Sequence, residues 1–425
     1  MTPQPSRLTI DTENQSQQPQ KTVNRRSFFG AAAATVGAGT VLAPYAMAKA
    51  AGEAGKSQVA RTSSEVTAGG TIPTGAVAES TAPHIISLIK KQPHFVGPAG
   101  SLSRVDVNDM PRMKRLSIRR LLLAPRGVRE PHWHVDAHEL GYCLRGEHLV
   151  TIAGNHSTRD SFTISPGEMF FVPSGALHHV ENIGVEEGEV ILAFSHEQPE
   201  DFGLSGTFGA FSDAVLGNTF DLPAAAFANL KRTAQDTVIN SRGTATVIGL
   251  QDRENSPYKY SLQATLPQIN SNAATAHLAQ INVWPTLRDL AMFAVDLTHQ
   301  GMRELHWHPE TAEMGYVAHG RGRMTIMSPG GSVDTFEMHP GDVYFIPTAY
   351  PHHFEDLGED ELKLLIFFDQ SKPGDVGMRS AVPGFSRDVV AASFNLSPSE
   401  IPDIPFLAQD TLFVQRINPV DSASR

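Results

Sequence analysis

Short apolar runs alternate with turns rich in glycine and proline from about residue 84 onward. The runs are four to eight residues long and contain many β-branched and aromatic side chains, a pattern typical of strands. They cover 116–123, 149–152, 169–172 and 190–194, and then 291–297, 323–327, 343–346 and 362–368. Many short strands joined by tight turns predict an all-β fold, a sandwich or barrel of the jelly-roll type.

The chain repeats itself within this region. Residues 129–139 read REPHWHVDAHE and residues 303–313 read RELHWHPETAE, and a second stretch at 167–178 returns at 341–352. Every pair of equivalent positions is 174 residues apart, so no insertion separates the two parts of either copy. This repeat predicts two domains built alike, over residues 84–240 and 241–425, each long enough to bury a core.

Each copy contains a candidate metal site. Successive side chains on a strand point to opposite faces, so histidines at positions i and i+2 share one face and can bind one ion. A glutamate five residues later and a histidine after the Pro turn complete each set. The two sets are His132, His134, Glu139 and His178, and His306, His308, Glu313 and His352. One H-x-H pair alone is weak evidence. A degenerate site kept only for packing would have lost ligands in one copy, and neither copy has lost any.

The residues that carry these sites also resemble a known family. The pattern G-x5-H-x-H-x4-E-x6-G followed by G-x5-P-x-G-x2-H-x3-N is that of the cupins, and the first copy matches it from His132 through Asn182. The second copy departs from it at Ala349 and Asp356. Two copies in one chain, each with Arg-Glu-x-His-Trp-His, resemble the bicupins of the oxalate decarboxylase and oxalate oxidase group. The resemblance implies two tandem cupin barrels with short flanking helices.

The same resemblance implies cofactors and partners. It implies one manganese ion per barrel, dioxygen as a second cofactor, and oxalate as substrate. Helical signals follow each barrel, at 222–230 and 386–394, and resemble the helices through which family members build homo-oligomers, either trimers or hexamers.

Two arginines are candidate substrate-binding residues. Arg129 and Arg303 each precede the first histidine ligand by three residues. A divalent ion with one carboxylate and three neutral imidazoles carries a net positive charge, and a guanidinium adds to it, which suits a small carboxylate such as oxalate. The alternative for each arginine is a salt bridge to the neighbouring Glu130 or Glu304.

The catalytic acid is where the sequence departs from the family. In the family a carboxylic acid beside the substrate separates the decarboxylase, which releases formate, from the oxidase, which releases peroxide. Leu204 stands where the glutamate of the decarboxylase lid is expected, and Ile366, with Leu192 as its counterpart, stands where a strand glutamate is expected. Glu197, Glu200 and Asp201 lie in the lid region and could replace the lid acid, with Glu200 as the candidate catalytic residue, although solvated loop charge is the alternative reading.

Several functions therefore remain open. An oxalate decarboxylase-like enzyme is the default, and an oxalate oxidase is a close second. An enzyme acting on another small organic acid and a manganese-binding protein without turnover are the other two alternatives.

The N-terminal segment predicts export. Residues 1–50 contain Arg25-Arg26 before a mildly apolar run and an Ala-Met-Ala site, which is typical of a twin-arginine signal peptide, and residues 51–83 form a predicted linker. The alternative, a transmembrane anchor, is disfavoured by the glycines and Pro44 in the run. The twin-arginine translocation machinery exports folded proteins, so the mature protein is expected to be periplasmic or secreted, from a bacterium. Loading in the cytoplasm would favour manganese over the copper or zinc that such sites otherwise prefer.

The net charge limits the binding partners, and the cysteine content limits the cross-links. The formal net charge of −11 argues against nucleic acid or an anionic membrane as a partner. The single cysteine, Cys143, excludes an internal disulfide and is expected to be a small buried side chain.

Overall fold

The computed structural model describes residues 84–246, 249, 256–358, 360–407 and 410–420. The predicted signal peptide and linker lie outside the described residues. Among the residues described, no helix combines the length and the apolar character needed to cross a membrane.

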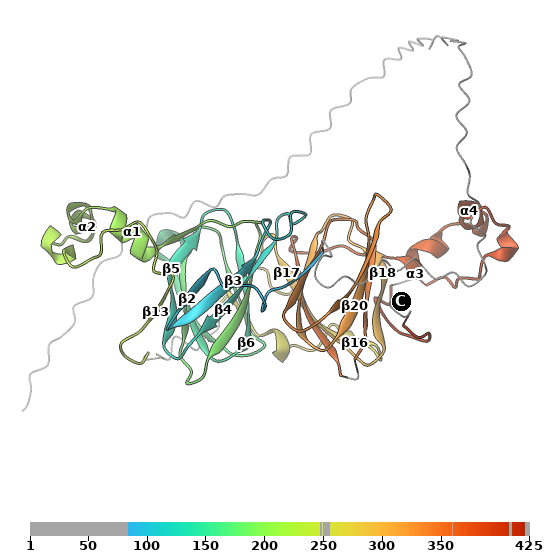
Figure 1. The fold of residues 1–425 in the computed structure, drawn as a ribbon, viewed down its shortest axis with the longest axis horizontal. Helices are drawn as coiled ribbons and strands as arrows, with labels where there is room; N and C mark the ends of the chain where they lie inside the picture. Colours follow the sequence, from blue (N-terminus) through green and yellow to red (C-terminus); the bar gives the residue numbers. More distant parts are fainter. Residues whose placement is uncertain (1–83, 247–248, 250–255, 359, 408–409, 421–425) are drawn as a thin grey trace, which may run out of the picture. The chain divides into compact units, whose positions relative to one another are not determined.

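The first barrel consists of two antiparallel sheets that enclose a core (Figure 1). One sheet has the strand order β12-β5-β10-β7-β8, with β13 also paired to β5. These strands are β5 (Gly127–His134), β7 (His148–Ala153), β8 (Arg159–Ile164), β10 (Leu177–Asn182), β12 (Asp201–Gly203) and β13 (Ile239–Ser241). The other sheet has the order β14-β9-β6-β11-β4-β3-β2. Its strands are β2 (Phe95–Gly97), β3 (Gly100–Val105), β4 (Ser117–Leu123), β6 (Glu139–Arg145), β9 (Met169–Val172), β11 (Gly188–Phe194) and β14 (Lys259–Tyr260).

The second barrel repeats this arrangement strand for strand. One sheet has the order β21-β20-β23-β18-β25, with β26 also paired to β18, and the other has the order β1-β22-β19-β24-β17-β16-β15. The strands of the first sheet are β18 (Gly301–Trp307), β20 (Gly322–Met327), β21 (Val333–Met338), β23 (His352–Asp356), β25 (Val376–Gly377) and β26 (Phe413–Gln415). Those of the second are β1 (Ile85–Ser87), β15 (Ile269–Asn270), β16 (Ala274–Ala279), β17 (Ala291–Leu297), β19 (Glu313–His319), β22 (Asp342–Ile346) and β24 (Leu362–Phe368).

Buried apolar side chains on these strands form one apolar core inside each barrel. Side chains such as Val150, Phe162 and Val190 are fully buried in the first, and Met324, Phe354 and Leu364 fill the second. All eight apolar runs form strands, and β9, β17 and β24 have the predicted limits. The prediction of an all-β fold with two jelly-roll barrels is confirmed.

Two short strands pair with the sheet of the other barrel. β1 precedes the first barrel in the chain but pairs with β22, and β14 follows that barrel but pairs with β9. A third apolar cluster contains side chains of both barrels, including Leu140, Phe171, Met314 and Phe345. β1 and β14 therefore each lie on the opposite side of the predicted boundary at residue 240 from the sheet that they join.

Short helices follow each barrel, and the first helix of each group contacts the strands of its barrel (Figure 1). After the first barrel come α1 (Leu204–Ala210), α2 (Asp213–Phe220) and η2 (Ala224–Phe227), and η4 (Leu262–Ala264) precedes β15. After the second come α3 (Met378–Ala381), η5 (Val382–Gly384), α4 (Arg387–Ser393) and η6 (Pro398–Glu400). A further turn, η1 (Asn155–Ser157), joins β7 to β8. Ser397 and Glu400 form a capping box at η6.

Candidate metal centres

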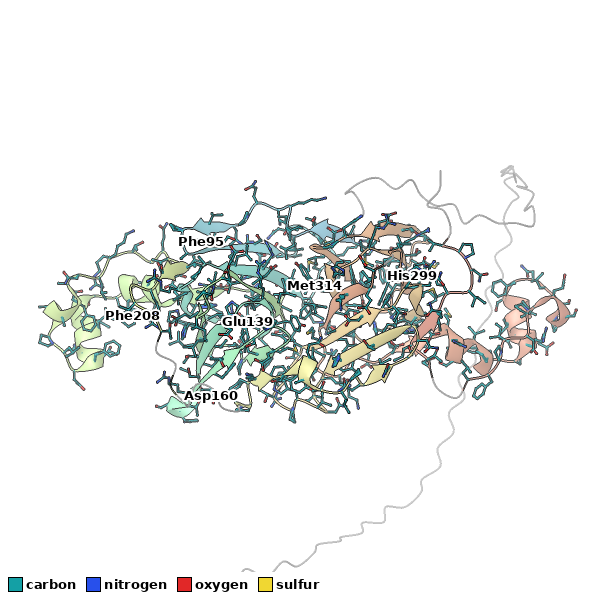
Figure 2. The ribbon with its side chains drawn as sticks, turned by 90° about the horizontal axis from the view of Figure 1, so that it is seen from below. Phe95, Glu139, Asp160, Phe208, His299 and Met314 are labelled. Carbon is teal, nitrogen blue, oxygen red and sulfur yellow. The ribbon has the colours of Figure 1, made fainter. Side chains whose placement is uncertain are left out.

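The first four-residue set converges inside the first barrel. His132 and His134 lie two residues apart on β5, and both are buried. β10 pairs with β5 so that His178 lies opposite His132, and Glu139 enters from the start of β6. One ligand atom from each of the four residues lies within 4.8 Å of the others. Figure 2 shows Glu139 among the strands of this barrel.

The second set repeats this construction. His306 on β18 lies opposite His352 on β23, and Glu313 begins β19. His306, His308, Glu313 and His352 are buried, and their ligand atoms also lie within 4.8 Å of one another. The structure therefore brings together all eight residues predicted as ligands, four in each barrel.

Hydrogen bonds at Nδ1 fix how the six imidazoles face. Five Nδ1 atoms lie 2.7–2.9 Å from a backbone carbonyl, which can only accept, so these nitrogens carry the proton. The sixth, His134 Nδ1, lies 2.9 Å from the Oδ1 atom of Asp201. In the neutral form of each ring, Nε2 then has no proton and can bind an ion, which is the tautomer that metal-binding histidines need.

Two buried nitrogens show that each centre has room for an ion. The Nε2 atoms of His178 and His352 are buried and make no hydrogen bond among the described residues, and each lies 3.4 Å from the nearest glutamate Oε2 atom. Buried polar atoms are rarely left without a partner. Three imidazole nitrogens and one carboxylate oxygen around such a gap fit a divalent transition metal.

The electrostatics of each centre keep its glutamate ionised. Burial alone would raise the pKa of Glu139, but the imidazoles of His178 and His134 hold that pKa below its usual range. Burial would also raise the pKa of Glu313, and the neighbouring imidazoles of His308 and His352 lower it instead. Both carboxylates are thus available as anionic ligands.

Arg129 forms a salt bridge, but not to Glu130. Its Nη2 atom lies 3.0 Å from the Asp201 carboxylate, and its Nη1 atom donates to the carbonyl of Val238 at 3.2 Å. The Glu130 carboxylate instead accepts the backbone N–H groups of Ser205 and Val238. Arg303 repeats the arrangement with the carboxylate of Asp375 and the carbonyl of Leu412, and Glu304 is farther away, at 3.9 Å.

One difference between the barrels lies beside these arginines. Arg119 on β4 forms a two-pronged salt bridge with Asp201, with N–O distances of 2.6 and 3.1 Å. The equivalent position on β17 is Phe293. With Asp201 and Asp375 both counted, the first centre carries one more positive charge than the second.

A second difference concerns the ligand glutamates. Tyr344 on β22 donates a hydrogen bond to Glu313, whereas the equivalent residue on β9 is Phe170. Asp375, Arg119 and Tyr344 were not among the predicted site residues, and Asp201 was considered only as a possible lid acid. Asp201 and Asp375 are 174 residues apart, so the internal repeat was a signal that could have found them.

The candidate acid Glu200 is not brought to the first centre. Its side chain is exposed, and its backbone N–H donates to Asp136. Leu204, at the predicted lid position, begins α1 and is half-buried, and Met378 occupies the equivalent place in the second barrel. Ile366 and Leu192 are buried in the apolar cores. None of these positions brings an acid to either centre.

Comparisons with known proteins agree with this construction. The chain is 28% identical over 305 residues to oxalate decarboxylase OxdC of Bacillus subtilis, covering 70% of this chain and 78% of that protein. It is 27% identical over 306 residues to a probable oxalate decarboxylase of Arthroderma benhamiae, covering 69% and 74%. A shorter stretch of 108 residues, 24% of this chain and 48% of the relative, is 35% identical to germin-like protein 3-5 of Oryza sativa subsp. japonica.

Solved structures show the same fold. A structure of Bacillus subtilis oxalate decarboxylase at pH 4.6 superposes with a TM-score of 0.70 at 23% identity, covering 81% of this chain and 91% of that one. Another structure of that enzyme, described for its Mn(II) centres, has a TM-score of 0.69 at 24% identity, covering 80% and 90%. The cupin family model matches this sequence twice, over residues 86–226 and 260–401. The chain therefore belongs to the cupin family and contains two cupin domains.

Proposed function

We propose that this bicupin converts oxalate at a manganese ion, as an oxalate decarboxylase-like enzyme. The observation that supports this most is a buried centre of three imidazoles and one carboxylate beside a guanidinium, in a chain similar to oxalate decarboxylases. Manganese is proposed because a structure of the Bacillus subtilis enzyme is described for its Mn(II) centres.

The first barrel is the better candidate for the anionic substrate. Arg119 gives its centre one more positive charge than the second centre, where Phe293 takes that place. Arg129 has five N–H donors, and its hydrogen bonds to Asp201 and Val238 use only part of them. The remaining donors can bind and orient a substrate carboxylate.

The chemistry divides between the ion and the chain. A bound manganese ion would supply an open coordination position and one-electron redox chemistry, with dioxygen as the oxidant. The barrel excludes water around the centre, since the four ligands are buried. Whether formate is released depends on whether a protein acid delivers a proton to the substrate carbon.

An oxalate oxidase is the second candidate, and Leu204 is the observation that favours it. The segment that begins α1 has an apolar side chain where the lid acid is expected. Glu200 is exposed, and both oxygens of Asp201 are engaged by Arg119, Arg129 and His134. None of these acids in the described part of the chain is then placed to deliver the proton, so oxidation to carbon dioxide with release of peroxide would compete.

Product analysis tests these candidates. Protein of measured manganese content is incubated with oxalate under oxygen, and formate, carbon dioxide and peroxide are quantified. Formate supports the decarboxylase, and peroxide without formate supports the oxidase. If a manganese-loaded sample consumes no oxalate, the proposal fails in favour of another small acid or of manganese binding without turnover.

We also propose that the twin-arginine machinery exports the protein to the periplasm or beyond. The Arg25-Arg26 pair ahead of an apolar run supports this. Replacing both arginines with lysine keeps the charge, and should leave the protein in the cytoplasm on cell fractionation. Export of this variant to the normal extent would contradict the proposal.

Homo-oligomers are the last part of the proposal. The helical segments after the barrels expose equivalent aromatic side chains, Phe211 and Phe385 as well as Phe220 and Phe394, each about half exposed or more. Figure 2 shows Phe208 on the segment after the first barrel. Exposed apolar side chains repeated at the same register suit contacts between copies of the chain, as in a trimer or hexamer.

A further inference from the structure

We propose that Asp201 is a positioning residue that makes the first metal centre chemically different from the second. Asp201 holds the His134 imidazole through Nδ1, and the second barrel has no carboxylate in that role among its described residues. The inference rests on the proposed metal sites, but not on oxalate as the substrate.

The pairing of β12 with β5 explains how Asp201 reaches His134. Asp201 lies directly opposite His134 in this antiparallel pair, so their side chains lie on the same face. The distance from His134 Nδ1 to Asp201 Oδ1 is 2.9 Å. Glu200, one residue earlier, points to the surface as the strand alternation requires.

Two arginines hold the Asp201 carboxylate in place. Arg119 donates to both of its oxygens, and Arg129 donates to Oδ2 at 3.0 Å. The Arg119 guanidinium carbon also lies 4.6 Å from the centre of the Phe194 ring, and this ring packs edge-on against His134 at 4.9 Å. The carboxylate is therefore fixed in position and remains ionised against a ligand imidazole.

The second barrel replaces this carboxylate with a peptide carbonyl. His308 Nδ1 donates to the Gly374 carbonyl at 2.7 Å. Asp375, the equivalent of Asp201, forms its salt bridge with Arg303. Phe293 takes the place of Arg119 and packs on Phe368, which in turn packs on His308. The rings are kept, but the charged network is lost.

This difference should alter the bound ion. An ionised carboxylate that accepts the Nδ1–H hydrogen bond makes Nε2 a more basic metal ligand than a backbone carbonyl does, and it fixes the ring orientation. Loss of such a partner commonly lowers metal affinity about 10- to 100-fold. The first centre is therefore expected to bind Mn²⁺ more tightly and to show a distinct electron paramagnetic resonance spectrum.

The two aspartates offer a matched pair of variants. Asp201→Asn keeps the size of the side chain but removes the charge that faces His134, and Asp375→Asn makes the same change where no metal ligand is contacted through a hydrogen bond. Each full-length variant is loaded with Mn²⁺. The affinity of each centre is measured by chelator competition, and the manganese spectrum is recorded.

Asp201→Asn should lower the Mn²⁺ affinity of one of the two centres about 10-fold or more and change one of the two spectral components. Asp375→Asn should change the affinity of either centre by no more than about 2-fold and leave the spectrum as it is. Equal effects of the two variants, or no effect of Asp201→Asn, would overturn the inference.

A second variant covers the case in which Asp201→Asn does not fold. Arg119→Lys keeps the charge but loses the fork that clamps Asp201. It should change the same spectral component by a smaller amount, and an unchanged component would again overturn the inference. A wild-type protein without bound manganese would contradict the proposed function instead, so the two failures are distinguishable.

Discussion

The hydroxyl of Tyr344 donates a hydrogen bond of 2.8 Å to Oε1 of Glu313. The other oxygen of this carboxylate, Oε2, lies 2.9 Å from Nε2 of His308 and faces the centre. A buried tyrosine therefore determines which oxygen of the glutamate is available to an ion. The first barrel has Phe170 at this position, and its Glu139 has no such contact.

Removing the Tyr344 hydroxyl should lower the metal affinity of the second centre only. Tyr344→Phe leaves a buried carboxylate oxygen without its donor, which is expected to cost about 1–3 kcal/mol of stability and about 10-fold in metal affinity. Urea denaturation and chelator competition measure the two effects. Tyr316→Phe, another buried tyrosine, is the control for loss of a hydroxyl. Loss of affinity at both centres would contradict the assignment.

A glycine makes room for the ring of Tyr344. A Cβ atom added at Gly315 would lie 2.1 Å from Cε1 of Tyr344, and the ring is fully buried. Gly315→Ala should therefore destabilise the protein by about 1–3 kcal/mol, as overpacking does. Gly330→Ala, where a Cβ meets nothing within 4 Å, should change stability by less than about 0.5 kcal/mol. Similar denaturation midpoints for the two variants would disprove the close contact.

Each set of ligands should account for one ion. The double variant His306→Ala/His308→Ala is expected to retain one manganese ion per chain, measured by elemental analysis, and His132→Ala/His134→Ala should do the same. His339→Ala, at an exposed position, should retain both. Manganese should also raise the melting temperature of the wild type, because an ion that binds only the folded state stabilises it. Two ions in either double variant would exclude these ligand sets.

The lid position should control the product. Leu204→Glu would place a carboxylic acid at the start of α1, beside the first centre, and should raise the ratio of formate to peroxide. Met378→Glu makes the equivalent change in the second barrel and should leave this ratio as it is if the first barrel binds the substrate. A larger response to Met378→Glu would assign turnover to the second barrel.

The exposed phenylalanines should support the oligomer. Phe385→Ser together with Phe394→Ser removes two side chains that are 63% and 65% exposed, and should lower the molar mass measured by light scattering after gel filtration. Val185→Ser, which changes an 87% exposed side chain elsewhere, is the control. An unchanged mass for the double variant would place the contacts between copies on another surface.

The strands could be predicted because their signal is local. The apolar run 362–368 can be assigned as a buried strand from its own sequence alone. In the structure it forms β24, and its side chains are buried in the core of the second barrel. The helix α1 could not be predicted in this way, since Leu204–Ala210 contains two glycines and no apolar period. Its first turn is held by distant carboxylates, because Asp236 accepts the N–H groups of Gly203 and Gly206, and Glu130 accepts that of Ser205.

The metal ligands could be predicted for the same reason. The repeat marks Asp201 and Asp375 as equivalent positions, but it does not show which residue either of them contacts. The spacing of His132 and His134 on one strand is enough to suggest a shared ion. Asp201 lies 67 residues from His134 in sequence, and their contact depends on the pairing of β12 with β5. Arg119 acts on His134 only through Asp201, so its role depends on the folded arrangement of three strands, β4, β5 and β12.

The exchange of β1 and β14 also bears on how such a chain can be divided. If the two halves were expressed separately, with the cut between β13 and β14, β1 and β14 would each be on the fragment that lacks their partner strand. β22 would lose β1, and β9 would lose β14. Each fragment would then present a bare backbone edge that invites aggregation. Mixing the two fragments could restore both edges at once, so their solubility should depend on being produced together.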